Sequence, residues 1–251
     1  MPSTPSIQWV CGSSPEHARQ LFWQSLAQWA RQNSGHGPLS LALTAGSSAR
    51  RYYQGWRREL ETAPPDIRAA FGENTLYFWS DERLVPYADP DSNYGMAREV
   101  LFSSPVFSSA SIFPAPVAGP PVDCARAYAQ TIRRSLSGAP VPRFDLILLG
   151  LGPDGHTASL FPGTDIYAED DAWVRAVSGA ADHPHDRLSF TPSLLNAARE
   201  VWFLVLGGEK RDAVAKLRAR RHSPRELPAL VVDPARTAVT CFLDAAAAEN
   251  G

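Results

Sequence analysis

The sequence has little lysine, no excess of either charge and no long apolar run, and each absence excludes a class of protein. Only Lys210 and Lys216 are lysines among 251 residues, and 24 basic residues face 26 acidic ones. This balance gives no reason to expect binding to nucleic acid. No apolar run approaches the length that crosses a membrane. The first twenty residues lack the basic and apolar regions of a signal peptide, so we expect no membrane association.

Cysteine is also scarce, and the three cysteines are scattered. Cys11, Cys124 and Cys241 lie far apart and show no metal-binding spacing. A small, odd number of separated cysteines is typical of proteins from a reducing compartment. We therefore expect reduced thiols and a cytoplasmic protein.

Short apolar runs alternate along the chain with amphipathic segments of helical spacing. The predicted strands are residues 7–10, 39–43, 74–80, 112–113, 144–149, 173–177, 187–190, 201–206, 230–232 and 237–243. The predicted helices are residues 15–33, 50–60, 93–102, 123–136, 192–199 and 207–220, with a loop or short helix at 63–71 and a frayed tail at 245–251. The alternation predicts an α/β fold: a single domain over residues 1–251, with a mostly parallel, Rossmann-like sheet and helices on both faces.

The stretch 144–163, FDLILLGLGPDGHTASLFPG, carries the clearest sign of a site. A buried strand runs into a glycine-rich turn that holds Asp154, and His156 follows directly. Ligands of open α/β sheets bind beyond the carboxyl ends of the strands, which is where this turn is expected. A lone histidine is more often a packing or capping residue, and that interpretation stays open for this segment alone. The neighbouring glycines, carboxylate and hydroxyls favour a functional role.

Two other strand ends carry groups that suit an anionic ligand. Gly46, Ser47 and Ser48 form a small-residue turn between a strand and a helix, a geometry in which backbone N–H groups and the helix dipole face an anion. A plain tight connection explains the same turn equally well. The charged run Asp81–Arg83 follows an aromatic strand and is either a solvated loop or part of the same site. Ser92 and Asn93 are most simply helix-capping residues.

The loop at residues 178–187 holds two histidines between two aspartates. Asp182, His183, His185 and Asp186 are residue types that bind metals, but no further ligand follows at a matching spacing. We interpret them as solvated loop residues and expect no metal.

Several motifs along the chain resemble those of the 6-phosphogluconolactonases. The most specific is GLGPDGHTASLFPG at 150–163. FWSDERLVP at 78–86, DSNYGMAREVLF at 91–102, DRLSFTPSLLNAAR at 186–199 and VWFLVLGGEKRDAV at 201–214 are also similar, and all occur in the family's order. The likeness covers roughly residues 7–243. It implies hydrolysis of 6-phosphoglucono-δ-lactone to 6-phosphogluconate, the second step of the oxidative pentose-phosphate pathway.

The resemblance also implies the chemical roles. His156 is expected to act as the general base that activates water, while Asp154 either orients its ring or merely shapes the turn. Arg83 is expected near the developing negative charge, positioned by Asp81 and Glu82.

Phosphate binding is expected from Arg187 and Lys210, which follow later strands, with help from Gly46, Ser47 and Ser48. We expect no cofactor, a small-molecule phosphosugar lactone as the sole partner, and a monomer or weak homo-oligomer.

The chain departs from the family's usual sequence at two positions of the first loop, and two alternative functions have to be considered. The family's first loop usually reads Ser-Gly-Gly-Ser-Thr-Pro, whereas this chain has Ala45 and Ala49 where a glycine and the proline stand. The related glucosamine-6-phosphate deaminases typically carry Tyr at the position of Arg83 and Glu at that of Phe161, so this chain lacks part of their acid/base set. A deaminase-like isomerase and a non-catalytic sugar-phosphate sensor are the alternative functions.

Overall fold

The computed structural model describes residues 6–35, 37–136, 140–164, 172–179 and 183–249. Its strands are β1 (Gln8–Gly12), β2 (Leu39–Leu43), β3 (Thr75–Trp79), β4 (Asp81–Arg83), β5 (Ser111–Ile112), β6 (Leu146–Gly150), β7 (Val174–Val177), β8 (Arg187–Phe190), β9 (Glu200–Val205) and β10 (Ala238–Asp244). Its α-helices are α1 (Pro15–Asn33), α2 (Ser47–Glu61), α3 (Pro65–Gly72), α4 (Asn93–Val100), α5 (Pro121–Ser135), α6 (Pro192–Ala197), α7 (Arg211–Ala219) and α8 (Ala245–Ala248). Three 3₁₀ turns are η1 (Pro105–Phe107), η2 (Gly208–Lys210) and η3 (Pro228–Val231).

Seven strands form a parallel sheet in the order β1-β10-β9-β6-β2-β3-β5. The chain builds outward from β2 through β3 to β5, and on the other side from β6 through β9 to β10. The strand order therefore reverses between β2 and β6, which is where open α/β sheets bind their ligands. The predicted α/β class and mostly parallel sheet are confirmed.

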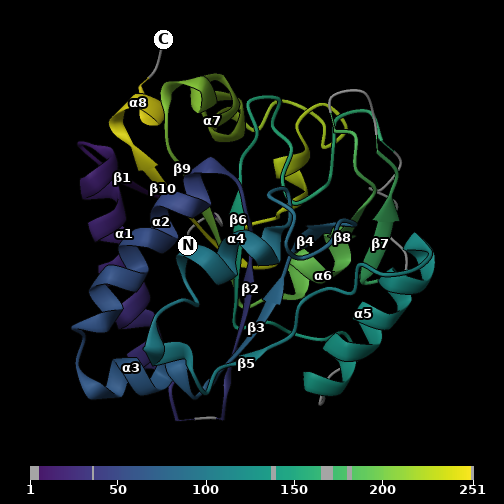
Figure 1. Ribbon diagram of the computed structural model, residues 1–251. Coiled ribbons are helices and arrows are strands. Elements are labelled where there is room, and N and C mark those ends of the chain that lie inside the picture. Colours follow the sequence, from purple (N-terminus) through teal and green to yellow (C-terminus); the bar gives the residue numbers. More distant parts are fainter. Residues whose placement is uncertain (1–5, 36, 137–139, 165–171, 180–182, 250–251) are drawn as a thin grey trace.

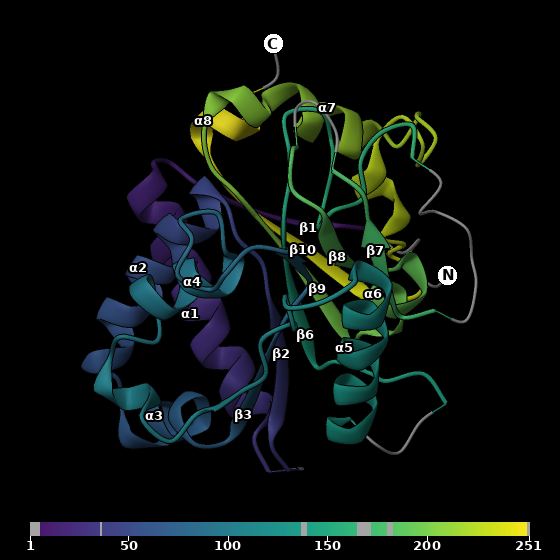
Figure 2. The ribbon, with the colours of Figure 1, turned by 45° about the vertical axis from the view of Figure 1, so that its right-hand side comes forward.

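Helices cover both faces of this sheet (Figures 1 and 2). Helices α1 to α4 lie on one face and α5 and α6 on the other. Two apolar cores match these layers. Aromatic residues such as Tyr52, Trp56 and Trp79 fill the first core, whereas the second gathers aliphatic residues of β6, β9 and β10 with α5, α6 and α7. None of the described helices is both long and apolar enough to pass through a bilayer.

Local signals fix several helix starts where the sequence predicts them. Ser14 caps α1 by accepting a hydrogen bond from the His17 N–H (3.1 Å), and Thr191 caps α6 from the Leu194 N–H (3.4 Å). Both caps are followed by proline at the first helical position, where the missing N–H costs nothing.

A second, antiparallel sheet of three strands lies beside the first, in the order β4-β8-β7. The charged run Asp81–Arg83 is thus a short strand rather than a loop, and Arg187 is the first residue of its partner strand. Ser80 separates β4 from β3, and its N–H still donates to the Leu43 carbonyl at the end of β2 (2.8 Å). This connection places the small sheet at the carboxyl edge of the large one.

Two predictions near the C-terminus are wrong. Residues 230–232 form no strand: η3 ends there, because Asn196 holds the segment by donating to the Val231 carbonyl (2.7 Å) and accepting from the Asp233 N–H (2.8 Å). The expected frayed tail contains α8, which Asp244 caps from the Ala247 N–H (3.0 Å). Residues 250–251 of that tail lie outside the described part of the chain.

Candidate active site

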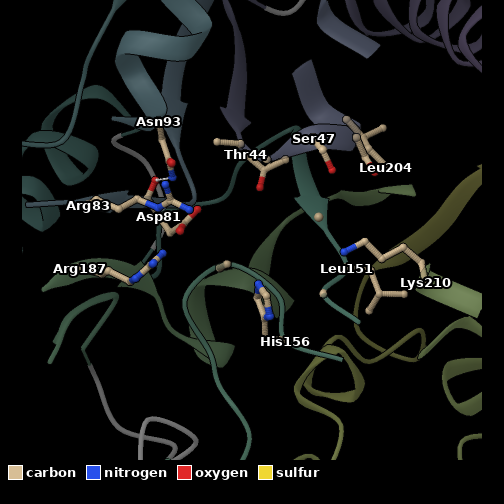
Figure 3. Close-up of a pocket in the computed structure, with 16 residues that line it drawn as sticks. Thr44, Ser47, Asp81, Arg83, Asn93, Leu151, His156, Arg187, Leu204 and Lys210 are labelled. Atoms are coloured by element: carbon tan, nitrogen blue, oxygen red, sulfur yellow. Dashed lines mark hydrogen bonds between the residues drawn. The ribbon is translucent and has the colours of Figure 1, made fainter. Parts of the chain in front are cut away.

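A pocket opens where the strand order reverses, between the ends of β2 and β6 and beside the small sheet (Figure 3). Its lining residues are Thr44, Ala45, Gly46, Ser47, Ser48, Asp81, Arg83, Asn93, Gly150, Leu151, Gly152, His156, Ala158, Arg187, Leu204 and Lys210. The structure therefore brings together every predicted site residue in the pocket lining except Asp154, which contacts His156.

The β2–α2 turn forms one wall. Gly46 adopts a left-handed conformation (φ 100°) and precedes α2, whose first turn has no side-chain cap. The first N–H groups of α2 are thus available to an anion. Ala45 is not left-handed, so the alanine that departs from the family's loop causes no strain there. The Ser48 hydroxyl is already engaged, because it accepts from the Leu206 N–H (3.0 Å); Ser47 is exposed.

The turn after β6 presents His156. The Gly152 N–H donates to the His156 carbonyl (2.8 Å), and the Thr157 hydroxyl donates to the Gly150 carbonyl (2.8 Å), which closes the turn. A Cβ atom on Gly152 would lie 2.1 Å from the imidazole Nδ1 and 2.5 Å from an Asp154 carboxylate oxygen. Only glycine at this position leaves room for the histidine and its carboxylate partner.

Asp154 contacts His156 through both the ring and the backbone. Its Oδ1 lies 2.6 Å from Nδ1 and also accepts the His156 backbone N–H at 3.1 Å. Burial raises the pKa of Asp154, but the hydrogen bonds and charge of His156 outweigh this and lower it to about 2. The carboxylate therefore stays ionised and accepts Nδ1–H, which leaves the lone pair of the neutral ring on Nε2.

The small sheet supplies two arginines. Arg83 and Arg187 face each other across β4 and β8, where like charges repel. Arg187 is only 6% exposed, and its pKa is lowered first by burial and then by the charge of Arg83. The Nε atoms of both arginines are buried and have no hydrogen-bond partner among the described residues. Two adjacent cations with unused donors suit an anionic ligand.

Asp81 stands between these arginines and the histidine loop. It is 4% exposed, and one carboxylate oxygen accepts the Ser159 hydroxyl at 2.8 Å. Ser159 follows Ala158, a pocket residue in the left-handed conformation (φ 47°) that is unusual outside glycine. Asp81 thereby ties the small sheet to the segment just after His156.

Lys210 comes from η2, at the end of β9. It is half-buried, and desolvation lowers its pKa against the charges of Glu209 and Asp154, which raise it. In the view of Figure 3, His156 lies between Arg187 on one side and Lys210 on the other. The two predicted phosphate anchors thus reach the pocket from different sheets.

Asn93 and His183 were interpreted differently from the sequence. Asn93, interpreted as a cap residue, lines the pocket, and Ser92 is the actual cap of α4. His183, interpreted as a solvated loop residue, instead stacks on Phe161 (ring centroids 4.2 Å apart) and lies 5.5 Å from the His156 ring. That interpretation is wrong for His183 because the chain folds back over the histidine turn.

In this position His183 lies close to two other residues that could bind a metal ion. One ligand atom each from Asp154, His156 and His183 lies within 4.8 Å of the others. Two imidazoles and a carboxylate match the donors that zinc binds. His185 is elsewhere, 2.8 Å from the Asp91 carboxylate, and Asp182 lies outside the described residues. That the protein works without a metal stays a prediction.

Comparison with known proteins agrees with this architecture. A 6-phosphogluconolactonase from Rattus norvegicus is 37% identical over 239 residues, covering 94% of this chain and 90% of the rat protein. One from Synechocystis sp. is 35% identical and covers 85% of each chain. The solved structure of 6-phosphogluconolactonase from Trypanosoma brucei superposes with a TM-score of 0.82 at 28% identity, covering 98% of this chain and 99% of that one.

A monomeric glucosamine-6-phosphate deaminase superposes with a TM-score of 0.78 over 96% of this chain and 99% of its own, but at 19% identity it shares the fold alone. Residues 13–241 match the family described as glucosamine-6-phosphate isomerases/6-phosphogluconolactonase. Because this match and the rat relative both span most of its length, the chain belongs to that family.

Proposed function

We propose that this protein is a 6-phosphogluconolactonase, which hydrolyses 6-phosphoglucono-δ-lactone to 6-phosphogluconate in the oxidative pentose-phosphate pathway. The observation that carries the proposal is the His156–Asp154 pair, at 2.6 Å, on the wall of a pocket that also holds three basic side chains. A base beside a cluster of cations suits the addition of water to an anionic ester.

His156 acts as the general base. Nε2 takes a proton from water as the water oxygen bonds to the lactone carbonyl carbon, and Asp154 stabilises the resulting imidazolium. Arg83 faces the negative charge that develops on the carbonyl oxygen, and Asp81 holds that side of the pocket in register. When the ring C–O bond breaks, the imidazolium returns its proton to the leaving ring oxygen. The products are a carboxylic acid, which ionises in water, and a free hydroxyl.

Arg187 and Lys210 anchor the phosphate. Arginine offers a planar fork of donors and lysine a compact charge. The N–H groups at the start of α2, with Gly46 and Ser47, complete the anion site. Ser48 contributes through its backbone, since its hydroxyl is bound to Leu206.

The deaminase alternative fails on its acid/base chemistry. Ring opening and isomerisation require protons to move between sugar carbons and oxygens, which calls for an acid/base group at the position of Phe161. Phe161 instead presents an aromatic ring 5.0 Å from the His156 ring. A sensor without catalysis has no use for the oriented base.

The test compares two reactions on one enzyme preparation. We expect rapid acid release from fresh 6-phosphogluconolactone, after subtraction of spontaneous hydrolysis at each pH, and no ammonia from glucosamine-6-phosphate. Product affinity without accelerated acid release would indicate the sensor. Ammonia formed at a rate comparable to lactone turnover would indicate the deaminase.

The remaining assignments extend the same proposal. The chain acts as a single domain, in the cytoplasm, where its three free cysteines stay reduced. It works as a monomer or a weak homo-oligomer, and one pocket formed within the chain suffices for the reaction. Gel filtration across a range of protein concentrations checks the oligomeric state.

A further inference from the structure

Glu82 is a carboxylate that the reaction above does not use, and it lies wholly inside the protein. Its side chain faces the start of α4. There Oε1 accepts the N–H groups of Arg83 (2.8 Å) and Asn93 (2.7 Å), while Oε2 accepts the N–H of Tyr94 (2.8 Å) and the hydroxyl of Ser92 (3.3 Å). One side chain therefore bonds to both β4 and α4, the two elements that form this wall of the pocket.

Capping of α4 is only one reason for a charge at this position. Ser92 already caps the helix, since its hydroxyl oxygen accepts the Gly95 N–H at 2.9 Å. All four donors are satisfied only by the ionised group, because an uncharged carboxamide offers one accepting oxygen instead of two. Two features beyond the helix end also favour the negative charge of Glu82.

The first feature is the pair of arginines. Arg83 and Arg187 stand opposite each other, and the charge of Arg83 disfavours the cationic form of its neighbour. The negative charges of Asp81, Asp91 and Glu82 act in the opposite direction and favour the cation. Glu82 has the smallest effect of the three on Arg187, and its direct link to the pair is the hydrogen bond that it accepts from the Arg83 N–H.

The second feature is Asn93. Glu82 fixes the backbone of this residue, and the Asn93 side chain donates from Nδ2 to the Asp81 carbonyl at 2.8 Å. The remaining oxygen, Oδ1, is buried and has no hydrogen-bond partner among the described residues. Asn93 is 1% exposed yet borders the pocket, and Figure 3 shows it beside Arg83 and Asp81. An acceptor held in this way suits a substrate hydroxyl.

We propose that ionised Glu82 is a positioning residue, which holds Arg83 and Asn93 in the arrangement that binds substrate, so that substrate affinity falls when its carboxyl group is protonated. This inference rests on the proposed lactonase function. Glu82 touches neither the pocket nor His156, so it acts on affinity through Asn93 and Arg83, and on the chemical step only through Arg83.

The titration of Glu82 falls in a useful range. Burial raises its pKa to about 7, against three backbone hydrogen bonds that lower it. The other charged or titratable groups around it are Asp81, Arg83, Tyr87, Tyr128 and Arg187. Burial raises the pKa of both tyrosines above its ordinary value, so both stay neutral where Glu82 titrates.

Glu82→Gln tests the inference, because it keeps the size of the side chain and removes the charge, together with one of the two accepting oxygens. Lactone hydrolysis between pH 6 and 8.5 gives KM and kcat, and calorimetry with 6-phosphogluconate gives product affinity without turnover. At pH 8 we expect KM and the product dissociation constant to rise about tenfold or more, with a smaller fall in kcat through Arg83. The rise in KM that wild type shows from pH 8 to pH 6 should shrink in the variant. Titration of the ligand's own phosphate affects both proteins equally.

Glu99→Gln is the matched control, on the same helix but exposed and paired with Arg50 (3.2 Å); it should match wild type. An unchanged KM and product affinity in Glu82→Gln would overturn the inference, and so would a loss confined to kcat. If Glu82→Gln does not fold, Glu82→Asp keeps the charge on a shorter stem. It must raise KM, and an unchanged KM overturns the inference. Absence of turnover in wild type would instead refute the lactonase function itself.

Discussion

The two walls of the pocket are built in different ways. The wall from the seven-stranded sheet consists of turns after parallel strands. Its proposed base is partly open to solvent, with the His156 side chain 27% exposed, and Ser47 is exposed, whereas Thr44 and Ser48 are buried. The wall from the small sheet and α4 consists of buried polar groups, with Asp81 4%, Arg187 6% and Asn93 1% exposed.

This difference matches the tasks assigned to the walls. A general base changes its charge in every cycle and exchanges protons with water, so partial exposure on a turn suits it. Groups that recognise a ligand gain from fixed geometry and low dielectric, which strengthen each hydrogen bond. In the proposed reaction the first wall supplies the base. The second fixes the orientation of the substrate and brings Arg83 to the developing charge, with Lys210 as a phosphate contact from the opposite side.

The largest expected effect separates the walls directly. His156→Ala should lower kcat by roughly 10²- to 10⁴-fold, the usual contribution of a general base, while 6-phosphogluconate affinity and the circular dichroism spectrum stay unchanged. Acid release and calorimetry on the same preparation measure both quantities. A variant with near-wild-type kcat would show that the first wall does not supply the base.

The second effect concerns stability and belongs to the buried wall. A pKa raised in the folded state means that ionisation of Glu82 opposes folding. The protonated carboxyl group therefore stabilises the fold. This contribution is complete below about pH 4.5 and is lost as pH rises through about 7. Over that interval we expect the unfolding free energy of wild type to fall by about 3 kcal/mol relative to Glu82→Gln. Urea unfolding at pH 4.5, 6 and 8 tests this, and parallel curves for the two proteins would contradict it. If the prediction is confirmed, ionisation of Glu82 at neutral pH favours substrate binding and lowers the free energy of unfolding.

The third effect compares anchors from opposite walls. Arg187→Ala should weaken 6-phosphogluconate binding by about 1.5–3 kcal/mol, roughly 10- to 150-fold, through loss of a charge-assisted bond. Lys210→Ala should lie toward the lower end of this range because Lys210 is only half-buried. Arg134→Ala, exposed on α5, is the control and should match wild type. Unchanged product affinity in both anchor variants would refute the phosphate site.

Most of the large sheet could be predicted from the sequence because parallel strands are buried on both faces. Leu39–Leu43 and Leu146–Gly150 are continuous apolar runs bounded by turn residues, and they predict strands without further information. The same rule placed the Gly46 turn and His156 at one edge. Periodicity failed at 230–232, where a side chain from a distant helix, Asn196, decides the backbone conformation.

The small sheet could not be predicted in this way. Asp81–Arg83 is three charged residues long, and its partner strand begins about a hundred residues later. Neither length nor pattern indicates such a pairing. His183 shows the same limit: it lies far from His156 in sequence, and the contact between the two rings arises only from tertiary packing. The sequence around Asn93 has two interpretations, because helix capping alone explains an Asn beside a capping Ser.

A smaller effect tests the support behind the base. Asp154→Asn should lower kcat about tenfold, since the amide oxygen still accepts Nδ1–H but no longer stabilises an imidazolium. Product affinity should stay unchanged, because Asp154 does not border the pocket. The lowered pKa of Asp154 means that its contribution to stability is present above about pH 4 and lost as pH falls toward 2. A kcat equal to that of wild type would leave Asp154 as a turn-shaping residue only.

The smallest effect concerns metal, and we expect none on activity. A single ion could be shared by Asp154, His156 and His183. An ion bound to the His156 ring and the Asp154 carboxylate would, however, occupy the lone pair that His156 needs as a base. Exhaustive treatment with a chelator, followed by the lactone assay, should give the wild-type rate. His183→Ala, which removes one of the three ligands, should respond to the chelator as wild type does. A rate that falls on chelation, returns with zinc and loses this response in His183→Ala would make the first wall a metal centre, and His156 a ligand rather than a base.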